Sequence, residues 1–163
     1  PAGGYDPFVT DPLDTNLIAI TSAVRNTVYY DRSSRTWSID HTWQTDRGKS
    51  LLLTGDIEAP DEVAMLARDA GALASDILLV PHHGSTTSST PDFLDAVGAR
   101  DAIVAAGYRN RFRHPRPEVM ARYESRGIRD WRTDRDGAVQ LRLAADGARF
   151  SAWRQVQRRY WQH

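Results

Sequence analysis

The sequence predicts an α/β fold with a mixed β-sheet. Three apolar runs without alternation, at residues 50–53, 76–80 and 102–106, are typical of strands that are buried on both faces. Segments with helical patterns separate these runs, as expected for parallel strands joined by helices. Near the C-terminus, two strand-like segments flank Asp146-Gly147, a pair that favours a hairpin turn. The middle of the chain therefore predicts a parallel sheet, and the end predicts antiparallel strands.

The first part of the chain carries weaker signals. Residues 1–16 contain three prolines and predict an irregular arm. Residues 17–20 and 27–30 are short β-rich runs that predict a hairpin, and residues 35–45 alternate as a half-buried strand does. No repeat or linker divides the sequence, so we expect a single domain over residues 1–163.

The expected helices have recognisable start and stop signals. A helix over residues 61–70 has acidic residues in its first turn, where they favour the helix dipole. Thr90 is positioned to cap a helix that begins at Pro91. A third helix begins at Pro117 and ends at Gly127. Three more strands are expected, at residues 128–131, 138–143 and 148–153.

Composition excludes several kinds of site. Lys plus Arg and Asp plus Glu both number 21, so any DNA contact needs a local basic patch rather than a global basic field. The chain has no cysteine, which excludes a disulfide scaffold and a thiolate zinc site. No apolar run reaches the roughly 18–20 residues of a transmembrane segment. Residues 155–163 form a basic, aromatic tail, which we interpret first as a solvated chain end.

Thr54-Gly55-Asp56 directly follows the first buried strand. Ligand sites in α/β sheets lie at the carboxyl ends of strands. A carboxylate at such a place is partly desolvated and needs a cation or hydrogen-bond donors, so Asp56 is a candidate metal ligand. An ordinary turn in which Asp56 caps the next segment explains the same residues.

The second candidate, Pro81-His82-His83-Gly84-Ser85, directly follows the second buried strand. Neutral imidazole is a good ligand for zinc and manganese ions. Gly84 allows a close approach of the backbone, and the Ser/Thr run that follows offers hydroxyls and amides to a phosphate. The alternative is one buried histidine bonded to backbone beside a polar loop.

The third candidate is the segment YRNRFRHP at residues 108–115, which follows the third strand. Arginine guanidinium groups suit phosphates, and aromatic rings stack on bases. A solvated basic loop before a helix explains the segment equally well. Because all three candidates follow strands that are expected to be parallel, we expect them to converge on one edge of the sheet.

Four blocks of the sequence resemble the C-terminal hydrolase domain of the ComEC DNA-uptake proteins, in the same order and with similar spacing. The blocks are LLLTGDIE, DILLVPHHGSTTSS, AGYRNRFRHPRPEVMARY and TDRDGAV, and the resemblance covers about residue 48 to the end. It implies a metallo-β-lactamase-like αββα sandwich and a metal-dependent nuclease that degrades one DNA strand during uptake. It also implies a domain tethered to the membrane channel portion of its parent protein, in the periplasm or on the outer face of the inner membrane.

The resemblance assigns metal binding and catalysis to particular positions. Asp56 matches the aspartate that bridges two metal ions, which would be manganese or zinc. His82 matches the late histidine ligand, with His83 as its alternate. Asp56, His83 and His114 are the expected catalytic residues, and His114 or an arginine would stabilise the departing charge.

Other matched positions are expected to contact substrate or to support the metal loop. Ser85 and Asn110 match positions near the substrate groove, and we assign them to substrate binding together with Arg111. Asp31 matches the early aspartate that braces the metal loop. The expected partner is single-stranded DNA.

The sequence departs from the family in the upstream His-x-His-x-Asp-His loop, because residues 1–47 contain a single histidine, His41, in the context SIDHTWQTD. A dinuclear metal site takes roughly eight ligands. The downstream blocks offer two or three, so we expect weak or partial metal binding by this chain. Because the upstream loop is missing, we also expect the N-terminal half of the fold to be incomplete. Two functions stay open: a metal-dependent DNA nuclease, and a catalytically incomplete DNA- or partner-binding module of the same fold.

Overall fold

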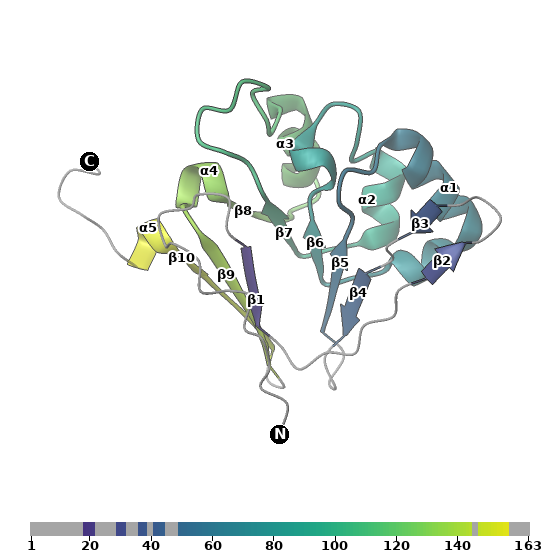
Figure 1. The fold of residues 1–163 in the computed structure, drawn as a ribbon, viewed down its shortest axis with the longest axis horizontal. Helices are drawn as coiled ribbons and strands as arrows, with labels where there is room; N and C mark the ends of the chain where they lie inside the picture. The colour runs from purple at the N-terminus through teal and green to yellow at the C-terminus, as the bar shows by residue number, and fades with distance from the viewer. Residues whose placement is uncertain are drawn as a thin grey trace.

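The computed structural model describes the backbone of four short segments and then most of the chain from residue 49 onward (Figure 1). The described residues are 18–21, 29–31, 36–38, 41–44, 49–144 and 147–156. The arm predicted at residues 1–16, the tail beyond residue 156 and Asp146 lie outside them. No helix within these ranges is long and apolar enough to cross a membrane.

A five-stranded sheet with the order β4-β5-β6-β7-β8 organises the described residues. These strands are His41–Gln44, Ser50–Leu53, Ile77–Leu79, Asp101–Val104 and Arg129–Arg132. Strands β5 to β8 are parallel, whereas β4 pairs antiparallel with β5 at the edge. The predicted parallel sheet is therefore confirmed.

A second sheet has the order β1-β9-β10, and its strands are Ile18–Thr21, Val139–Ala144 and Gly147–Ala152. The antiparallel pairing of β9 with β10 confirms the predicted C-terminal hairpin. Strand β1 pairs with β9 in parallel. A separate antiparallel pair consists of β2 (Tyr29–Asp31) and β3 (Thr36–Ser38).

Helices α2 and α3 begin at the predicted prolines, whereas α1 begins two residues before the predicted residue 61 and α3 ends at Glu124, before the predicted Gly127. The predicted cap by the Thr90 side chain is wrong, because Thr90 precedes α2 without a side-chain hydrogen bond to it. Proline is the first residue of α2 and of α3, where its missing N–H costs no hydrogen bond. Gly98 ends α2 in the left-handed conformation, with φ 59°. The helices and 3-10 turns are α1 (Ala59–Asp69), η1 (Ala70–Leu73), η2 (Pro81–Gly84), α2 (Pro91–Val97), α3 (Pro117–Glu124), α4 (Thr133–Asp136) and α5 (Trp153–Val156).

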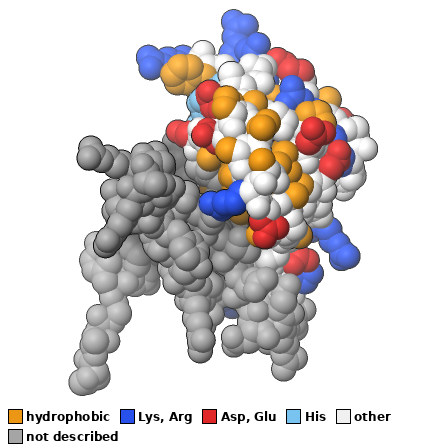
Figure 2. Space-filling model, turned by 90° about the vertical axis from the view of Figure 1, so that its right-hand side faces the viewer, with side chains coloured by type: hydrophobic (Ala, Val, Ile, Leu, Met, Phe, Trp, Pro, Cys, Tyr) orange, Lys and Arg blue, Asp and Glu red, His pale blue; other side chains and the backbone are white. Residues whose placement is uncertain are grey.

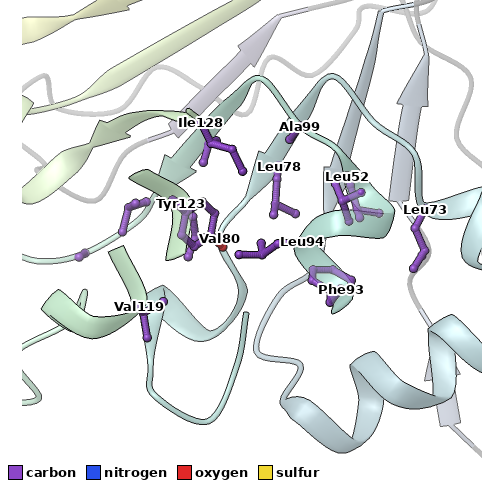
Figure 3. Close-up of a cluster of buried hydrophobic side chains, with 14 residues drawn as sticks. Leu52, Leu73, Leu78, Val80, Phe93, Leu94, Ala99, Val119, Tyr123 and Ile128 are labelled. Atoms are coloured by element: carbon purple, nitrogen blue, oxygen red, sulfur yellow. The ribbon is translucent and has the colours of Figure 1, made fainter. Parts of the chain in front are cut away.

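Strands β5, β6 and β7 are buried on both faces of the five-stranded sheet, as their continuous apolar sequences predict. One face packs against α1, α2 and α3, and Figure 3 shows Leu52 and Leu78 of the sheet beside Phe93 and Leu94 of α2. The other face packs against the second sheet through residues of β5, β6, β7 and β9, namely Leu51, Ile77, Ile103, Val139, Leu141 and Leu143. Burying one such side chain stabilises the fold by about 1.5–3 kcal/mol, so both faces fix the strand register.

These layers confirm the predicted α/β sandwich with mixed sheets. Figure 1 shows α1, α2 and α3 on one side of the five-stranded sheet and β9 and β10 on the other. Within the described ranges the order is helices, sheet, sheet, which gives three of the four layers that the resemblance implies.

Two predictions for the first part of the chain are wrong. Residues 17–20 and 27–30 do not form a hairpin with each other, because β1 pairs with β9 and β2 pairs with β3. Residues 35–45 are not one strand, since β3 and β4 belong to different sheets. The apolar pattern of a strand specifies its buried face and not its partner, so distant packing decides the pairing.

Asp134 and Asp136 lie in the short helix α4. The Asp136 carboxylate accepts a hydrogen bond from the backbone N–H of Arg132 at 3.0 Å, at the start of this helix. It also accepts from the Arg135 guanidinium at 2.9 Å. An acidic side chain that binds N–H groups at a helix start favours one helical turn over an open loop.

Candidate functional site at the carboxyl edge of the five-stranded sheet

The three candidate segments meet at the carboxyl ends of β5, β6 and β7, as their positions after parallel strands predict. The backbone N–H of His82 donates to the carbonyl oxygen of Gly55 at 3.0 Å, which joins the first loop to the second. The His83 ring nitrogen Nδ1 lies 2.7 Å from the carbonyl oxygen of Ala105, which joins the second loop to the third. Figure 1 shows these loops at the upper end of the sheet.

Asp56 and His83 face each other at this edge, and their facing atoms are both acceptors. Because a carbonyl oxygen only accepts, the Nδ1 of His83 must donate to Ala105, and Nε2 of the neutral ring then carries a lone pair. That Nε2 atom lies 3.5 Å from Oδ1 of Asp56. Two lone pairs at this separation can both be offered to a bound cation. The pair is therefore suited to hold a positive charge at the solvent-facing edge.

His82 is oriented by a residue that the sequence did not single out, Glu58. Nδ1 of His82 lies 3.1 Å from Oε1 of Glu58, and the Thr87 hydroxyl donates to the same carboxylate oxygen at 2.9 Å. A carboxylate at Nδ1 fixes the ring and leaves Nε2 available as a ligand atom, as carboxylates that hold the outer ring nitrogen of metal-bound histidines do. The backbone of both His82 and His83 is left-handed, with φ 46° and 56°.

The loop after the histidines is held by a buried acid. Glu62 of α1 is fully buried, and its carboxylate accepts hydrogen bonds from the backbone N–H groups of Ser89 and Thr90. Ser85 is itself buried, and its hydroxyl lies 3.1 Å from that of Thr87. Ser85 therefore lies beside the residues that orient His82, and its contact with substrate stays a prediction.

The third loop brings His114 close to His82, with 6.0 Å between the ring centroids. Gly84 makes this approach possible, because a Cβ at Gly84 would lie 2.6 Å from the Cβ of Pro115. The N–H of Arg116 donates to the carbonyl of Gly84 at 2.9 Å and fastens the two loops together. Burial lowers the pKa of His114 below its ordinary value, and electrostatic interactions with His82, His83 and Arg116 lower it further.

Asn110 holds the third loop in shape. Its side-chain amide donates to the carbonyls of Gly107 and His114 at 3.0 and 2.6 Å, and its oxygen accepts from the N–H of His114 at 2.9 Å. Arg111 is exposed, with its guanidinium 4.7 Å from the ring centroid of Phe112. Substrate contacts by Asn110 and Arg111 stay predictions. Asp31 ends β2, and its side chain lies outside the described part of the chain.

The described residues do not complete a metal site. Within residues 49–144 and 147–156, no group of three or more histidine, aspartate or glutamate side chains gathers closely enough to hold an ion. The imidazole and carboxylate donors are of the right chemical kind, but they come as pairs, Asp56 with His83 and Glu58 with His82. Further ligands would have to come from elsewhere.

Sequence reasoning missed Glu58, Thr87 and Glu62. Glu58 lies two residues after Asp56, and its position before α1 resembles that of an ordinary helix-start residue. Thr87 is one of several hydroxyl residues in a row, and nothing in the sequence distinguishes it. Glu62 has the spacing of a solvated acid in the first turn of a helix, yet it is fully buried. The one available signal was the proximity of Glu58 to the Thr-Gly-Asp segment.

Comparisons with known proteins found several relatives. The chain is 39% identical over 115 residues to "Competence protein ComA" of Neisseria gonorrhoeae, which covers 71% of this chain and 16% of that protein. It is 37% identical over 118 residues to "Uncharacterized protein YcaI" of Escherichia coli, covering 72% and 16%. It is 33% identical over 111 residues to "ComE operon protein 3" of Bacillus subtilis, covering 68% and 14%. The aligned part is thus a small fraction of each relative, and no family model matches the chain.

Proposed function

We propose, on the premise that this chain is related to one segment of the ComEC family of competence proteins, that it is a metal-dependent DNA nuclease of the metallo-β-lactamase-like fold. Its role is to degrade one strand during DNA uptake for transformation. Its parent is a membrane protein, and the domain works beside the channel portion, in the periplasm or on the outer face of the inner membrane.

The observation that carries the proposal is the convergence of Asp56, His82, His83 and His114 at one edge of the sheet. The Asp56 and His83 pair is suited to a cation, and Glu58 leaves the Nε2 of His82 available. A cation at such a place would neutralise the negative charge of a phosphodiester, and hydrolysis needs this charge to be stabilised in the transition state. His114 lies beside His82 on the loop that carries the arginines.

Two manganese or zinc ions are the cofactor that the proposal requires. Since the described residues form pairs of donors rather than a complete site, the missing ligands have to come from residues outside the described ranges or from other parts of the parent protein. This chain contributes the downstream side of the site, with Asp56 and His82 as ligands.

The test is cleavage of 5′-labelled DNA by the purified chain in manganese, zinc or chelator. We expect cleavage with manganese, loss of cleavage with chelator, and loss with Asp56→Asn. The matched control is Asp92→Asn, an exposed aspartate on α2, and its cleavage should equal that of the unaltered chain. Cleavage that survives both the chelator and Asp56→Asn would overturn the proposal.

The second candidate is a catalytically incomplete module that binds DNA or a partner. Two observations favour it: the described ranges contain no three-residue metal group, and the loop over residues 108–113 exposes aromatic and basic side chains. The same experiment separates the candidates. DNA binding in chelator, without cleavage in either metal, favours the binding module over the nuclease.

A further inference from the structure

Two aromatic rings of the third loop are exposed to solvent. Tyr108 is 56% exposed and Phe112 is 59% exposed, although burial of an aromatic side chain would stabilise the fold. The loop lies at the same edge as the histidines. In Figure 2, orange hydrophobic and blue basic side chains stand together at the upper edge, beside a pale-blue histidine.

An arginine guanidinium group lies over each of these two rings. The guanidinium carbon of Arg109 lies 5.1 Å from the centroid of the Tyr108 ring, and that of Arg111 lies 4.7 Å from the Phe112 ring. Arg154 of α5 approaches Tyr108 as well, at 5.7 Å. An aromatic ring with a guanidinium group beside it suits a nucleotide, because the base can stack on the ring and the phosphate can pair with the guanidinium group.

The loop is held in one conformation before any ligand binds. Arg109 and Arg113 have left-handed backbones, with φ 52° and 58°, and the three hydrogen bonds of the Asn110 side chain close the loop on itself. The start of the loop is also fixed, because the N–H of Ala106 donates to the buried Thr133 hydroxyl at 2.8 Å. Preorganised rings lose little entropy on binding.

The exposed Phe112 ring is connected to the candidate site by a row of rings. Phe112 stacks on His114, with 5.8 Å between centroids and 28° between planes. His114 meets His82 edge-on, with 6.0 Å between centroids. A base that stacks on Phe112 would therefore bring its own phosphate close to the histidines.

We propose that Tyr108 and Phe112 are base-stacking residues that make single-stranded DNA, rather than duplex, the substrate of this edge. An unpaired base offers its face to a ring, whereas a paired base within a duplex is stacked on both sides. Arg109 and Arg111 contact the backbone phosphates. Delivery of the strand to His82 rests on the proposed function, but the binding of unpaired bases does not require it.

The test is binding by the full chain in chelator, so that cleavage plays no part. The probes are a fluorescent twelve-nucleotide oligo-dT, an abasic oligonucleotide of the same length, and a duplex. We expect oligo-dT to bind most tightly. The double change Tyr108→Leu with Phe112→Leu keeps apolar bulk and removes the rings, and it should weaken oligo-dT binding by roughly 10-fold or more while leaving abasic binding unchanged.

Control variants separate stacking from charge and from folding. Phe112→Tyr should restore most of the affinity lost on Phe112→Leu. Arg111→Ala should weaken binding of oligo-dT and of the abasic strand alike, whereas Arg100→Ala, an exposed arginine at the opposite edge of the sheet, should change neither.

Equal affinity for oligo-dT and the abasic strand, or for oligo-dT and duplex, would overturn the inference. Unchanged oligo-dT binding by the double leucine variant would overturn it as well. These results are distinct from failure of the nuclease proposal, which concerns Asp56 and metal. A chain that binds through its rings but never cleaves would keep this inference and lose the nuclease.

Discussion

Carboxylates at the two edges of the five-stranded sheet differ in their partners and in their exposure. At the amino edge, Asp76 accepts hydrogen bonds from Lys49 and Ser50, and Asp101 accepts from Arg129 and Trp131. At the carboxyl edge, Asp56 and Glu58 face His83 and His82 instead. The side chains of Asp101 and Asp76 are 14% and 25% exposed, against 69% and 44% for Asp56 and Glu58. Asp76 and Asp101 at the amino edge are neutralised within the fold, whereas Asp56 and Glu58 at the carboxyl edge keep capacity for a ligand.

Strained backbone conformations also distinguish the two edges of the sheet. Among the described residues, the non-glycine positions with positive φ are His82, His83, Ser89, Arg109 and Arg113, and all of them lie in carboxyl-edge loops. Each such conformation costs on the order of 1 kcal/mol. Buried polar anchors below the loops, Glu62 and Thr133, offset that cost. The loops after β6 and β7 thus depend on buried polar anchors, whereas Asp76 and Asp101 at the amino edge form ion pairs.

The largest expected effect on stability is the loss of the Glu62 anchor. Glu62→Ala leaves the backbone N–H groups of Ser89 and Thr90 without their acceptor, which we expect to cost about 3 kcal/mol. Urea unfolding followed by tryptophan fluorescence measures it. Glu62→Gln keeps one acceptor oxygen and should cost less than Glu62→Ala. Equal, small losses for both variants would show that the loop does not depend on this anchor.

A smaller effect is expected for Asp76→Asn at the amino edge, about 1 kcal/mol, because the hydrogen bonds to Lys49 and Ser50 weaken. Burial raises the pKa of Asp76, but the bonds from Lys49 and Ser50 outweigh it and hold the pKa below its ordinary value of 3.8. A depressed folded-state pKa stabilises the fold above the unfolded value, and that contribution disappears as the pH falls through the folded value.

The stability difference between the unaltered chain and Asp76→Asn should therefore be constant from neutral pH down to about pH 5, and it should shrink below 3.8. Urea unfolding at a series of pH values measures it. A difference that grows as the pH falls would contradict the assignment of Asp76 as a neutralised acid.

The sequence predicted those parts of the fold that depend on local pattern. Residues 50–53, 76–80 and 102–106 were recognised because a strand buried on both faces has no polar alternation. The convergence of Asp56, His82 and His114 followed from placing candidates after parallel strands. The hairpin at 17–20 and 27–30 failed because β1 finds its partner in β9, more than a hundred residues away.

The local sequence could not predict the roles of residues that act through a partner distant in the sequence. Glu58 matters because folding brings it to His82, and Glu62 because it is buried against the loop over residues 85–90. In both cases the local sequence indicates an ordinary helix start. Burial of an acid depends on tertiary packing, which periodicity within one helix does not reveal.

The smallest expected effect on stability is at Asp56. Asp56→Asn removes the charge of a side chain that faces His83 across 3.5 Å and is mostly exposed, so the free energy of unfolding should change by less than about 0.5 kcal/mol. Urea unfolding of this variant beside Asp76→Asn measures the contrast directly. A loss for Asp56→Asn as large as that for Asp76→Asn would make Asp56 a structural acid like those of the amino edge. A negligible loss combined with loss of manganese-dependent cleavage would mean that the charge of Asp56 serves the ligand rather than the fold.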